Sequence, residues 1–230
     1  MQPPWVITLA TPGGDGRAHL YPPADLPEGT RAPRGTVLLG HGAGGGVDAP
    51  DLQALTALSG DGWVVALLEQ PWRVAGRRIA VAPPKLDEAA TAMLMALAVP
   101  PHLLPRPWVL GGRSAGARVA ARLSAHAQAL CLIAFPLQPP APHPPMTKTG
   151  RARATPASRR EELLIPLRAG IPTLVLQGAS DRFGSPDQIA GVGAPFENAL
   201  TVRSYLGDHN RTEDVDALVV EVAGFLAALP

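Results

Sequence analysis

The sequence predicts an α/β fold in which a mostly parallel sheet is covered by helices on both faces. Uninterrupted apolar runs of strand length alternate along the chain with longer segments of helical periodicity, and this alternation is typical of parallel sheets with two covered faces. The length of 230 residues suits one domain of this class. Neither an internal repeat nor a second core interrupts the pattern, so we expect residues 1–230 to form a single domain.

The first part of the chain begins with a predicted hairpin. Residues 6–9 and 17–20 are expected to pair as short strands across a glycine-rich turn at residues 12–16. A buried strand at residues 36–39 and a helix at residues 51–58 follow, and this helix has Leu52, Leu55 and Leu58 on one face. The next strand is predicted at residues 63–68 and the next helix at residues 86–97, whose apolar positions recur at spacings of three and four.

The second part of the chain repeats the alternation. The predicted strands are residues 108–110, 130–135, 173–176 and 199–205, and the predicted helices are residues 114–125, 186–189 and 215–229. Cys131 lies in one of these strands, where we expect a small buried apolar residue. The proline-rich and basic stretch at residues 136–160 is expected to be a hydrated loop, with an anion-binding patch as the alternative. Because it follows the carboxyl end of a strand, we expect it to overhang the functional site.

Charge and apolar content exclude several classes of partner. The chain has 20 Lys and Arg against 19 Asp and Glu, so no basic surface for nucleic acid or anionic membrane is expected. The longest apolar stretch, residues 89–99, is too short to cross a membrane, and residues 1–10 do not resemble a signal peptide. One cysteine allows no disulfide framework, which favours a reducing compartment. We expect a cytoplasmic protein, and the sequence does not indicate its oligomeric state.

Gly112-Arg113-Ser114-Ala115-Gly116 carries the strongest signal of chemistry. A Gly-x-Ser-x-Gly segment between a strand and a helix forms a sharp turn that exposes the serine hydroxyl as a nucleophile. The flanking glycines suit this role because the strained backbone leaves no space for bulky neighbours. The helix N-terminus beside the hydroxyl is positively polarised. The alternative is a tight turn without a chemical role.

A nucleophilic serine needs a base, and the base needs an acid that orients it. In this class of site the acid follows the serine and the histidine comes last along the chain. His126, His143 and His209 follow Ser114, but His126 belongs to the helix that the serine begins and His143 lies in the proline-rich loop. His209 lies between the last strand and the last helix. We therefore predict that it is the base.

Asp181 is the predicted acid because it follows the strand at residues 173–176 by a few residues. Its alternative role is a local turn in which the carboxylate accepts a backbone hydrogen bond. Asp208 adjoins the histidine but is expected to point elsewhere, and Asp187 is expected at a helix start.

The glycine-rich turn at residues 40–46 predicts an oxyanion hole. The backbone N–H of Ala115, after the nucleophile, would be one donor, and the N–H of Ala43 would be the second, with Gly44 as the alternative.

These motifs resemble those of the α/β-hydrolase superfamily, over about residues 35–228. The segments Gly111-Gly112-Arg113-Ser114, Phe135-Pro136-Leu137 and Gln177-Gly178 with Asp181 look like the small dienelactone-hydrolase-like branch. The resemblance implies an α/β-hydrolase fold with little or no lid and Ser114, Asp181 and His209 as the catalytic triad. Two positions depart from it: dienelactone hydrolases have cysteine where Ser114 stands, and Arg182 stands where proline is expected. Some members of this branch are components of larger complexes.

Two other interpretations of the sequence remain open. Gly40, Gly42 and Gly45 match the spacing of a dinucleotide-binding turn, with Glu69 near the place of a ribose-binding acid. In such a protein the helix would begin inside the motif, whereas residues 47–50 delay it here. The second alternative is a catalytically silent α/β-hydrolase fold that binds a partner. For Arg113, pairing with a nearby carboxylate competes with recognition of an anionic acyl group.

The sequence therefore predicts a serine hydrolase that cleaves a carboxylic ester or a related acyl bond through an acyl-enzyme. Its partner would be a small acyl substrate in a shallow, open site. The histidines are scattered and show no metal-ligand spacing, so neither a metal nor a cofactor is expected.

Overall fold

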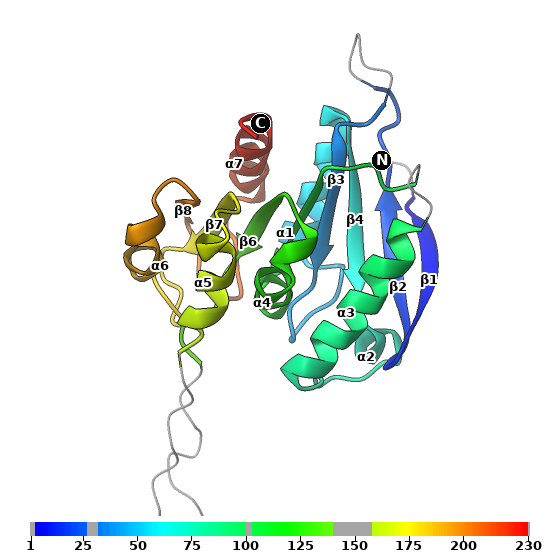
Figure 1. The fold of residues 1–230 in the computed structure, drawn as a ribbon, viewed down its shortest axis with the longest axis horizontal. Helices are drawn as coiled ribbons and strands as arrows, with labels where there is room; N and C mark the ends of the chain where they lie inside the picture. The colour runs from blue at the N-terminus through cyan, green and yellow to red at the C-terminus, as the bar shows by residue number, and fades with distance from the viewer. Residues whose placement is uncertain (1–2, 27–31, 100–102, 140–157, 230) are drawn as a thin grey trace, which may run out of the picture.

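An eight-stranded sheet forms the centre of the molecule (Figure 1). The computed structural model describes residues 3–26, 32–99, 103–139 and 158–229. The strands are β1 (Trp5–Thr11), β2 (Gly14–Tyr21), β3 (Gly35–Gly40), β4 (Trp63–Glu69), β5 (Trp108–Arg113), β6 (Ala129–Ile133), β7 (Thr173–Gly178) and β8 (Leu200–Tyr205). Their order across the sheet is β1-β2-β4-β3-β5-β6-β7-β8. The β1–β2 and β2–β4 pairs are antiparallel, and all later pairs are parallel.

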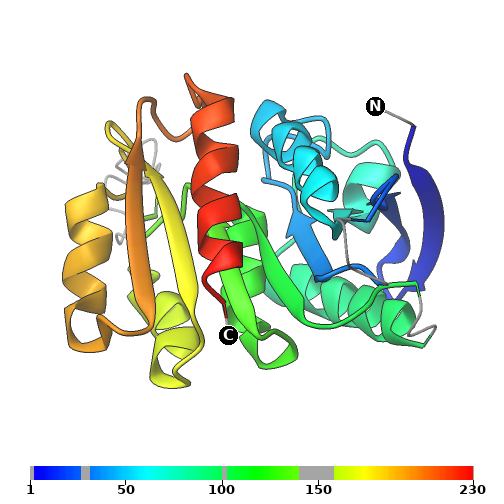
Figure 2. The same ribbon diagram turned by 90° about the horizontal axis from the view of Figure 1, so that it is seen from above.

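Helices cover both faces of the sheet, as Figure 2 shows from above. The helices are α1 (Pro50–Ala54), α2 (Pro71–Val74), α3 (Pro83–Ala98), α4 (Ala115–Arg122), α5 (Arg160–Arg168), α6 (Pro186–Gly193) and α7 (Val215–Ala227). Short 3₁₀ stretches cover Leu55–Asp61, Ser124–His126 and Ala194–Phe196. Helices α3, α4, α5 and α6 contribute to the apolar core on one face, and α1 and α7 to the core on the other. The predicted α/β architecture with two covered faces is confirmed.

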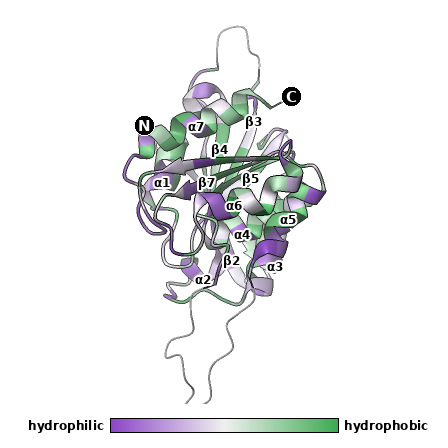
Figure 3. Ribbon diagram, turned by 90° about the vertical axis from the view of Figure 1, so that its left-hand side faces the viewer, coloured by the Kyte–Doolittle hydropathy of each residue, from purple (hydrophilic) through white to green (hydrophobic). Residues whose placement is uncertain are grey.

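Strand β3 shows how one sequence segment supplies both cores. Leu38 belongs to the core beneath α3 and α4, whereas Val37 and Leu39 belong to the core beneath α1 and α7, because successive side chains of a strand point to opposite faces. All three side chains are buried. The central strands are accordingly hydrophobic over most of their length in Figure 3. Cys131 is buried in β6, as predicted.

Several elements differ from the expectation. The predicted strand at residues 130–135 ends at Ile133, because Ala134 has a positive φ of 48° and turns the chain out of the sheet. The predicted helices at residues 51–58 and 114–125 each end early and continue as a 3₁₀ stretch. Helices α2 and α5 were not predicted. Helix α5 contains Pro166, a residue that argues against a helix interior.

Part of the proline-rich stretch has no described structure. Residues 140–157, which include His143, lie outside the described residues. Of its basic residues, Arg159 and Arg160 are described: Arg160 begins α5, and Arg159 donates to the Pro136 carbonyl at 3.0 Å. Within the described part of the chain, no helix combines the length and apolar character that a membrane crossing requires.

Candidate active site

Ser114 lies at the sharp turn between β5 and α4, as predicted. Its backbone has φ 51° and ψ −104°, a combination that a residue with a side chain adopts only under strain. Two hydrogen bonds hold the turn: the Ser114 N–H donates to the Ile133 carbonyl at 2.9 Å, and the Arg118 N–H donates to the Ser114 carbonyl at 3.1 Å. Strand β6 and helix α4 thus fix the serine from two sides.

The glycines beside Ser114 allow the turn to pack directly on β3. A Cβ atom built on Gly116 would lie 2.1 Å from the Gly40 carbonyl oxygen, and one on Gly112 would lie 2.2 Å from the same oxygen. Gly112 also has a φ of +142°. Close approach of backbone to backbone is therefore the physical reason for both glycines.

The structure brings Ser114, His209 and Asp181 together in one chain of hydrogen bonds. The Ser114 Oγ lies 2.9 Å from the His209 Nε2, and the His209 Nδ1 lies 2.8 Å from the Asp181 Oδ2. Because a carboxylate only accepts, Nδ1 carries the proton and the bare Nε2 is left to accept the serine proton. His209 and Asp181 are both buried, and all three side chains follow the carboxyl ends of parallel strands.

Asp181 is oriented by two further donors. Its Oδ1 accepts from the Phe183 N–H at 2.8 Å, and its Oδ2 accepts from the Gln177 Nε2 at 2.9 Å. The local turn that we considered as the alternative therefore exists together with the contact to histidine. Gln177 was not predicted. It is fully buried on β7, and a glutamine within an otherwise apolar strand was the signal that could have found it.

Arg113 holds the histidine segment in place. Its guanidinium donates to the Asp51 carboxylate and to the backbone carbonyl of His209, and the side chains of Arg113 and Asp51 are largely buried. This finding supports the pairing interpretation of Arg113. The Phe183 ring packs edge-on against the imidazole of His209 at a centroid distance of 4.5 Å.

The predicted oxyanion donors lie beside the serine. Ala115 is the first residue of α4, so its N–H has no carbonyl partner within the helix. The N–H of Ala43 likewise has no partner among the backbone hydrogen bonds of the described residues. Both residues line the same apolar cavity.

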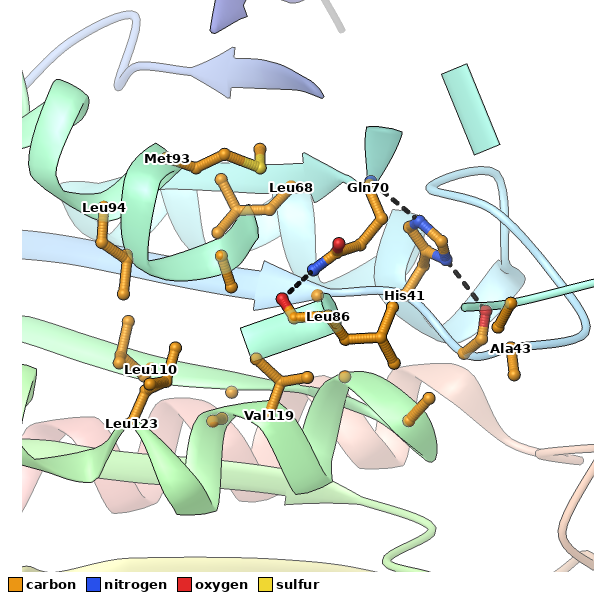
Figure 4. Close-up of a pocket in the computed structure, with 18 of the residues that line it drawn as sticks. His41, Ala43, Leu68, Gln70, Leu86, Met93, Leu94, Leu110, Val119 and Leu123 are labelled. Atoms are coloured by element: carbon orange, nitrogen blue, oxygen red, sulfur yellow. Dashed lines mark hydrogen bonds between the residues drawn. The ribbon is translucent and has the colours of Figure 1, made fainter. Parts of the chain in front are cut away.

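His41 is a structural part of the glycine turn that sequence reasoning did not single out. Its Nδ1 donates to the Gly42 carbonyl at 2.9 Å, and its Nε2 accepts from the Gln70 N–H at 3.1 Å, as Figure 4 shows from the side of the cavity. Burial lowers the pKa of His41 below its usual value of 6.5, which favours the neutral ring that these two bonds require. His41 therefore ties the turn after β3 to the end of β4.

Two spaces lie on either side of the glycine turn near Ser114. A small apolar cavity of about 40 Å³ lies between the glycine turn, α3 and α4. A wider cleft of about 650 Å³, with a mixed polar and apolar lining, contains Ser114, His209, Arg182, Arg211 and other residues. Gly42 and Ala43 line both. A reacting carbonyl at the serine would thus have one side toward the cavity and the other toward the cleft.

The dinucleotide-binding alternative does not fit the structure. Helix α1 begins at Pro50, well after the glycine turn, whereas the helix of a pyrophosphate site follows the turn directly. The Glu69 carboxylate contacts His19 at 3.2 Å and Arg17 at 3.8 Å. The glycine turn therefore lacks the helix of a dinucleotide site, and Glu69 has a structural role.

Comparison with known proteins agrees with the fold. A family model described as an alpha/beta hydrolase domain matches residues 33–215, which include Ser114, Asp181 and His209. The chain belongs to this family. No curated protein sequence matches it significantly.

Solved α/β-hydrolase structures superpose on almost the whole chain. A serine hydrolase homologue from Coxiella burnetii has 15% identity and a TM-score of 0.70, covering 98% of this chain and 97% of its own. A serine hydrolase without a lid from Xanthomonas campestris has 20% identity and a TM-score of 0.67, covering 100% and 97%. Est1E from Butyrivibrio proteoclasticus has 12% identity and a TM-score of 0.72, covering 96% and 97%. At these identities the similarity is one of fold.

Proposed function

We propose that this α/β-hydrolase cleaves carboxylic esters or related acyl bonds by a serine mechanism. The observation that carries the proposal is the continuous hydrogen-bond chain from the Ser114 Oγ through His209 to Asp181, with distances of 2.9 and 2.8 Å. A serine without such a base is a poor nucleophile. The serine hydrolase structures with the same fold support the same chemistry.

Acylation follows from the geometry. The Ser114 Oγ attacks the carbonyl carbon while the His209 Nε2 takes the hydroxyl proton. Asp181 holds the imidazole in the tautomer with the proton on Nδ1 and stabilises the imidazolium that forms. When the tetrahedral intermediate collapses, the bond from the carbonyl carbon to the leaving group breaks. The leaving group takes the proton from Nε2.

Deacylation repeats these steps with water as the nucleophile. Water attacks the acyl-enzyme carbonyl and gives a proton to His209, and the Ser114 Oγ regains that proton as the carboxylic acid departs. In both halves the N–H groups of Ala43 and Ala115 would bind the developing oxyanion. The strained backbone of Ser114 helps to keep its hydroxyl beside these two N–H groups.

The two spaces beside Ser114 favour a short acyl group and a larger leaving group. His209 protonates the leaving group, so the leaving group belongs in the cleft that His209 lines. The acyl chain then extends into the apolar cavity, whose volume of about 40 Å³ holds about three water-sized groups. The cavity therefore suits acyl chains of about three or four carbons.

The test is hydrolysis of p-nitrophenyl esters of increasing acyl length by wild type and Ser114→Ala. We expect kcat/KM to be highest for the propionate or butyrate ester and to fall for the octanoate. Ser114→Ala should lower kcat by at least about a thousand-fold.

Equal product release by the two proteins would instead favour the catalytically silent alternative, in which the fold binds a partner. A steep preference for the octanoate would contradict the assignment of the acyl group to the small cavity.

We further propose that the protein belongs to the dienelactone-hydrolase-like branch that its motifs resemble. We also propose that it acts in the cytoplasm. The support is the absence of any disulfide framework, since the sequence has one cysteine and Cys131 is buried. A small acyl compound, rather than nucleic acid or membrane, is the proposed partner.

A further inference from the structure

Two residues that line the apolar cavity each have a buried polar atom without a partner. The Gln70 Oε1 and the Trp72 Nε1 have no hydrogen-bond partner among the residues that the structure describes, and both side chains line the cavity beside Ala43 and Ala115. Trp72 is 3% exposed and Gln70 is 9% exposed. Buried polar atoms of this kind are rare and call for a physical reason.

The free atom of Gln70 is assigned by its contacts. The Nε2 donates to the Leu86 carbonyl at 3.2 Å, which a side-chain oxygen cannot do, so the Oε1 is the atom left without a partner. The backbone N–H of Gln70 donates to His41. Figure 4 shows the Gln70 amide among the aliphatic side chains of the cavity. Gln70 therefore presents a fixed acceptor next to the glycine turn.

Trp72 presents a donor in the same cavity. Its ring lies edge-on to His41 at a centroid distance of 5.4 Å, and both nitrogens of His41 already have backbone partners. The Trp72 Nε1 is therefore a buried donor without a partner on a residue that lines the cavity. The remaining side chains of the lining are almost all aliphatic: Leu68, Ala80, Leu86, Ala90, Met93, Leu94, Leu110, Val119, Ala120 and Leu123.

The pairing of one acceptor with one donor in an aliphatic pocket selects the chemistry of the ligand. We propose that the cavity binds a short acyl chain that carries a hydroxyl group, so that the preferred substrates are esters of small hydroxy acids. This inference rests on the proposed function. A hydroxyl both donates to the Gln70 Oε1 and accepts from the Trp72 Nε1. A keto oxygen has no proton for Gln70, and a charged group would lose its hydration in this pocket.

Unpaired groups of this kind discriminate strongly between related ligands. A site that binds a plain alkyl chain leaves the Gln70 Oε1 and the Trp72 Nε1 unpaired, whereas a hydroxyalkyl chain satisfies one or both. One such hydrogen bond corresponds to a preference of about 3- to 10-fold in kcat/KM.

The experiment compares the p-nitrophenyl esters of butyrate, 2-hydroxybutyrate and 3-hydroxybutyrate. Each kcat/KM is divided by the hydroxide-catalysed rate of the same ester, which removes the electronic effect of the hydroxyl. We expect wild type to prefer one of the hydroxy esters by about 3- to 10-fold. Gln70→Met, which removes the acceptor, and Trp72→Phe, which removes the donor and keeps the ring, should each reduce this ratio toward one.

Met93→Leu is the matched control because it changes the shape of the same cavity without touching a polar atom. It should alter kcat/KM for the plain and the hydroxy esters in parallel and leave their ratio as in wild type. Thermal unfolding of every variant shows whether it is folded, and because the readout is a ratio within one protein, a partial loss of folded protein cancels.

A binding measurement separates this inference from the proposed function. With Ser114→Ala protein, methyl 3-hydroxybutyrate or methyl 2-hydroxybutyrate should raise the unfolding temperature at lower concentration than methyl butyrate does, and Gln70→Met should abolish the difference. Binding of this kind without any turnover by wild type would support the hydroxyl site while contradicting the esterase. Turnover in which the butyrate ester equals or exceeds both hydroxy esters, or in which Gln70→Met and Trp72→Phe keep the wild-type ratio, would overturn the hydroxyl site alone.

Discussion

Arg113 joins three segments that are distant in the sequence. Its guanidinium donates to Asp51 on α1 and to the carbonyl of His209, and it directly precedes Ser114. Because the pair with Asp51 is largely buried, loss of one partner leaves a buried charge without compensation. We infer that Arg113 positions the loop of His209, which then keeps its imidazole against Ser114.

Arg113→Met should therefore lower both stability and activity. We expect the free energy of unfolding to fall by about 3 kcal/mol, and kcat to fall because the His209 carbonyl loses its donor. Urea denaturation and ester hydrolysis measure the two effects. The control is Arg203→Met, because Arg203 pairs with Glu221 on the surface with both side chains about half exposed, and such a change should cost less than about 1 kcal/mol. If both substitutions had equally small effects on stability and hydrolysis, this would contradict the positioning role of Arg113.

At the scale of elements, the candidate site depends on the contact between the turn at Ser114 and the end of β3. Gly40 on β3 faces Gly112 and Gly116 across a distance that leaves no space for a side chain. The same end of β3 leads into the glycine turn that carries Ala43. A shift of α4 away from β3 would thus move Ser114 and both proposed oxyanion donors relative to one another.

Gly116→Ala tests this contact. Its Cβ would lie 2.1 Å from a backbone oxygen, so α4 has to move, and we expect a loss of about 3 kcal/mol in the free energy of unfolding together with reduced hydrolysis. The matched control is Gly224→Ala, which is also in a helix but meets nothing within 4 Å. We expect Gly224→Ala to raise the free energy of unfolding by about 0.5 to 1 kcal/mol. Gly116→Ala protein with wild-type stability would show that the packing is not required.

Across the whole molecule, the sequence was most informative where one physical effect dominates. Apolar periodicity predicted the buried strands, and the order of Ser114, Asp181 and His209 predicted which side chains meet. Elements decided by tertiary packing were missed: α5, which tolerates Pro166 inside it, and α2, which has only four residues. The supporting contacts of Gln177, His41 and Gln70 depend on distances between strands, which a single sequence does not contain.

The stability of the whole molecule should respond to pH through His41. Burial lowers the pKa of His41 in the folded protein below the ordinary 6.5, so below pH 6.5 the unfolded chain binds a proton that the folded protein does not. The free energy of unfolding should therefore decrease as pH falls from 6.5 toward the lowered value. Urea denaturation between about pH 7 and pH 5 measures this slope.

His41→Gln should reduce that slope, since glutamine does not titrate. The difference between the two proteins isolates His41 from the other histidines. Identical slopes for wild type and His41→Gln would contradict a lowered pKa at this position.

The most direct test of the central claim, that His209 and Asp181 activate Ser114, is labelling by a fluorophosphonate probe followed by mass spectrometry of the labelled peptide. We predict that the probe modifies Ser114, that His209→Ala and Asp181→Ala strongly slow labelling, and that His126→Ala, a substitution at an exposed histidine, does not. Labelling at another residue, or labelling of Ser114 at an undiminished rate in His209→Ala, would contradict the account.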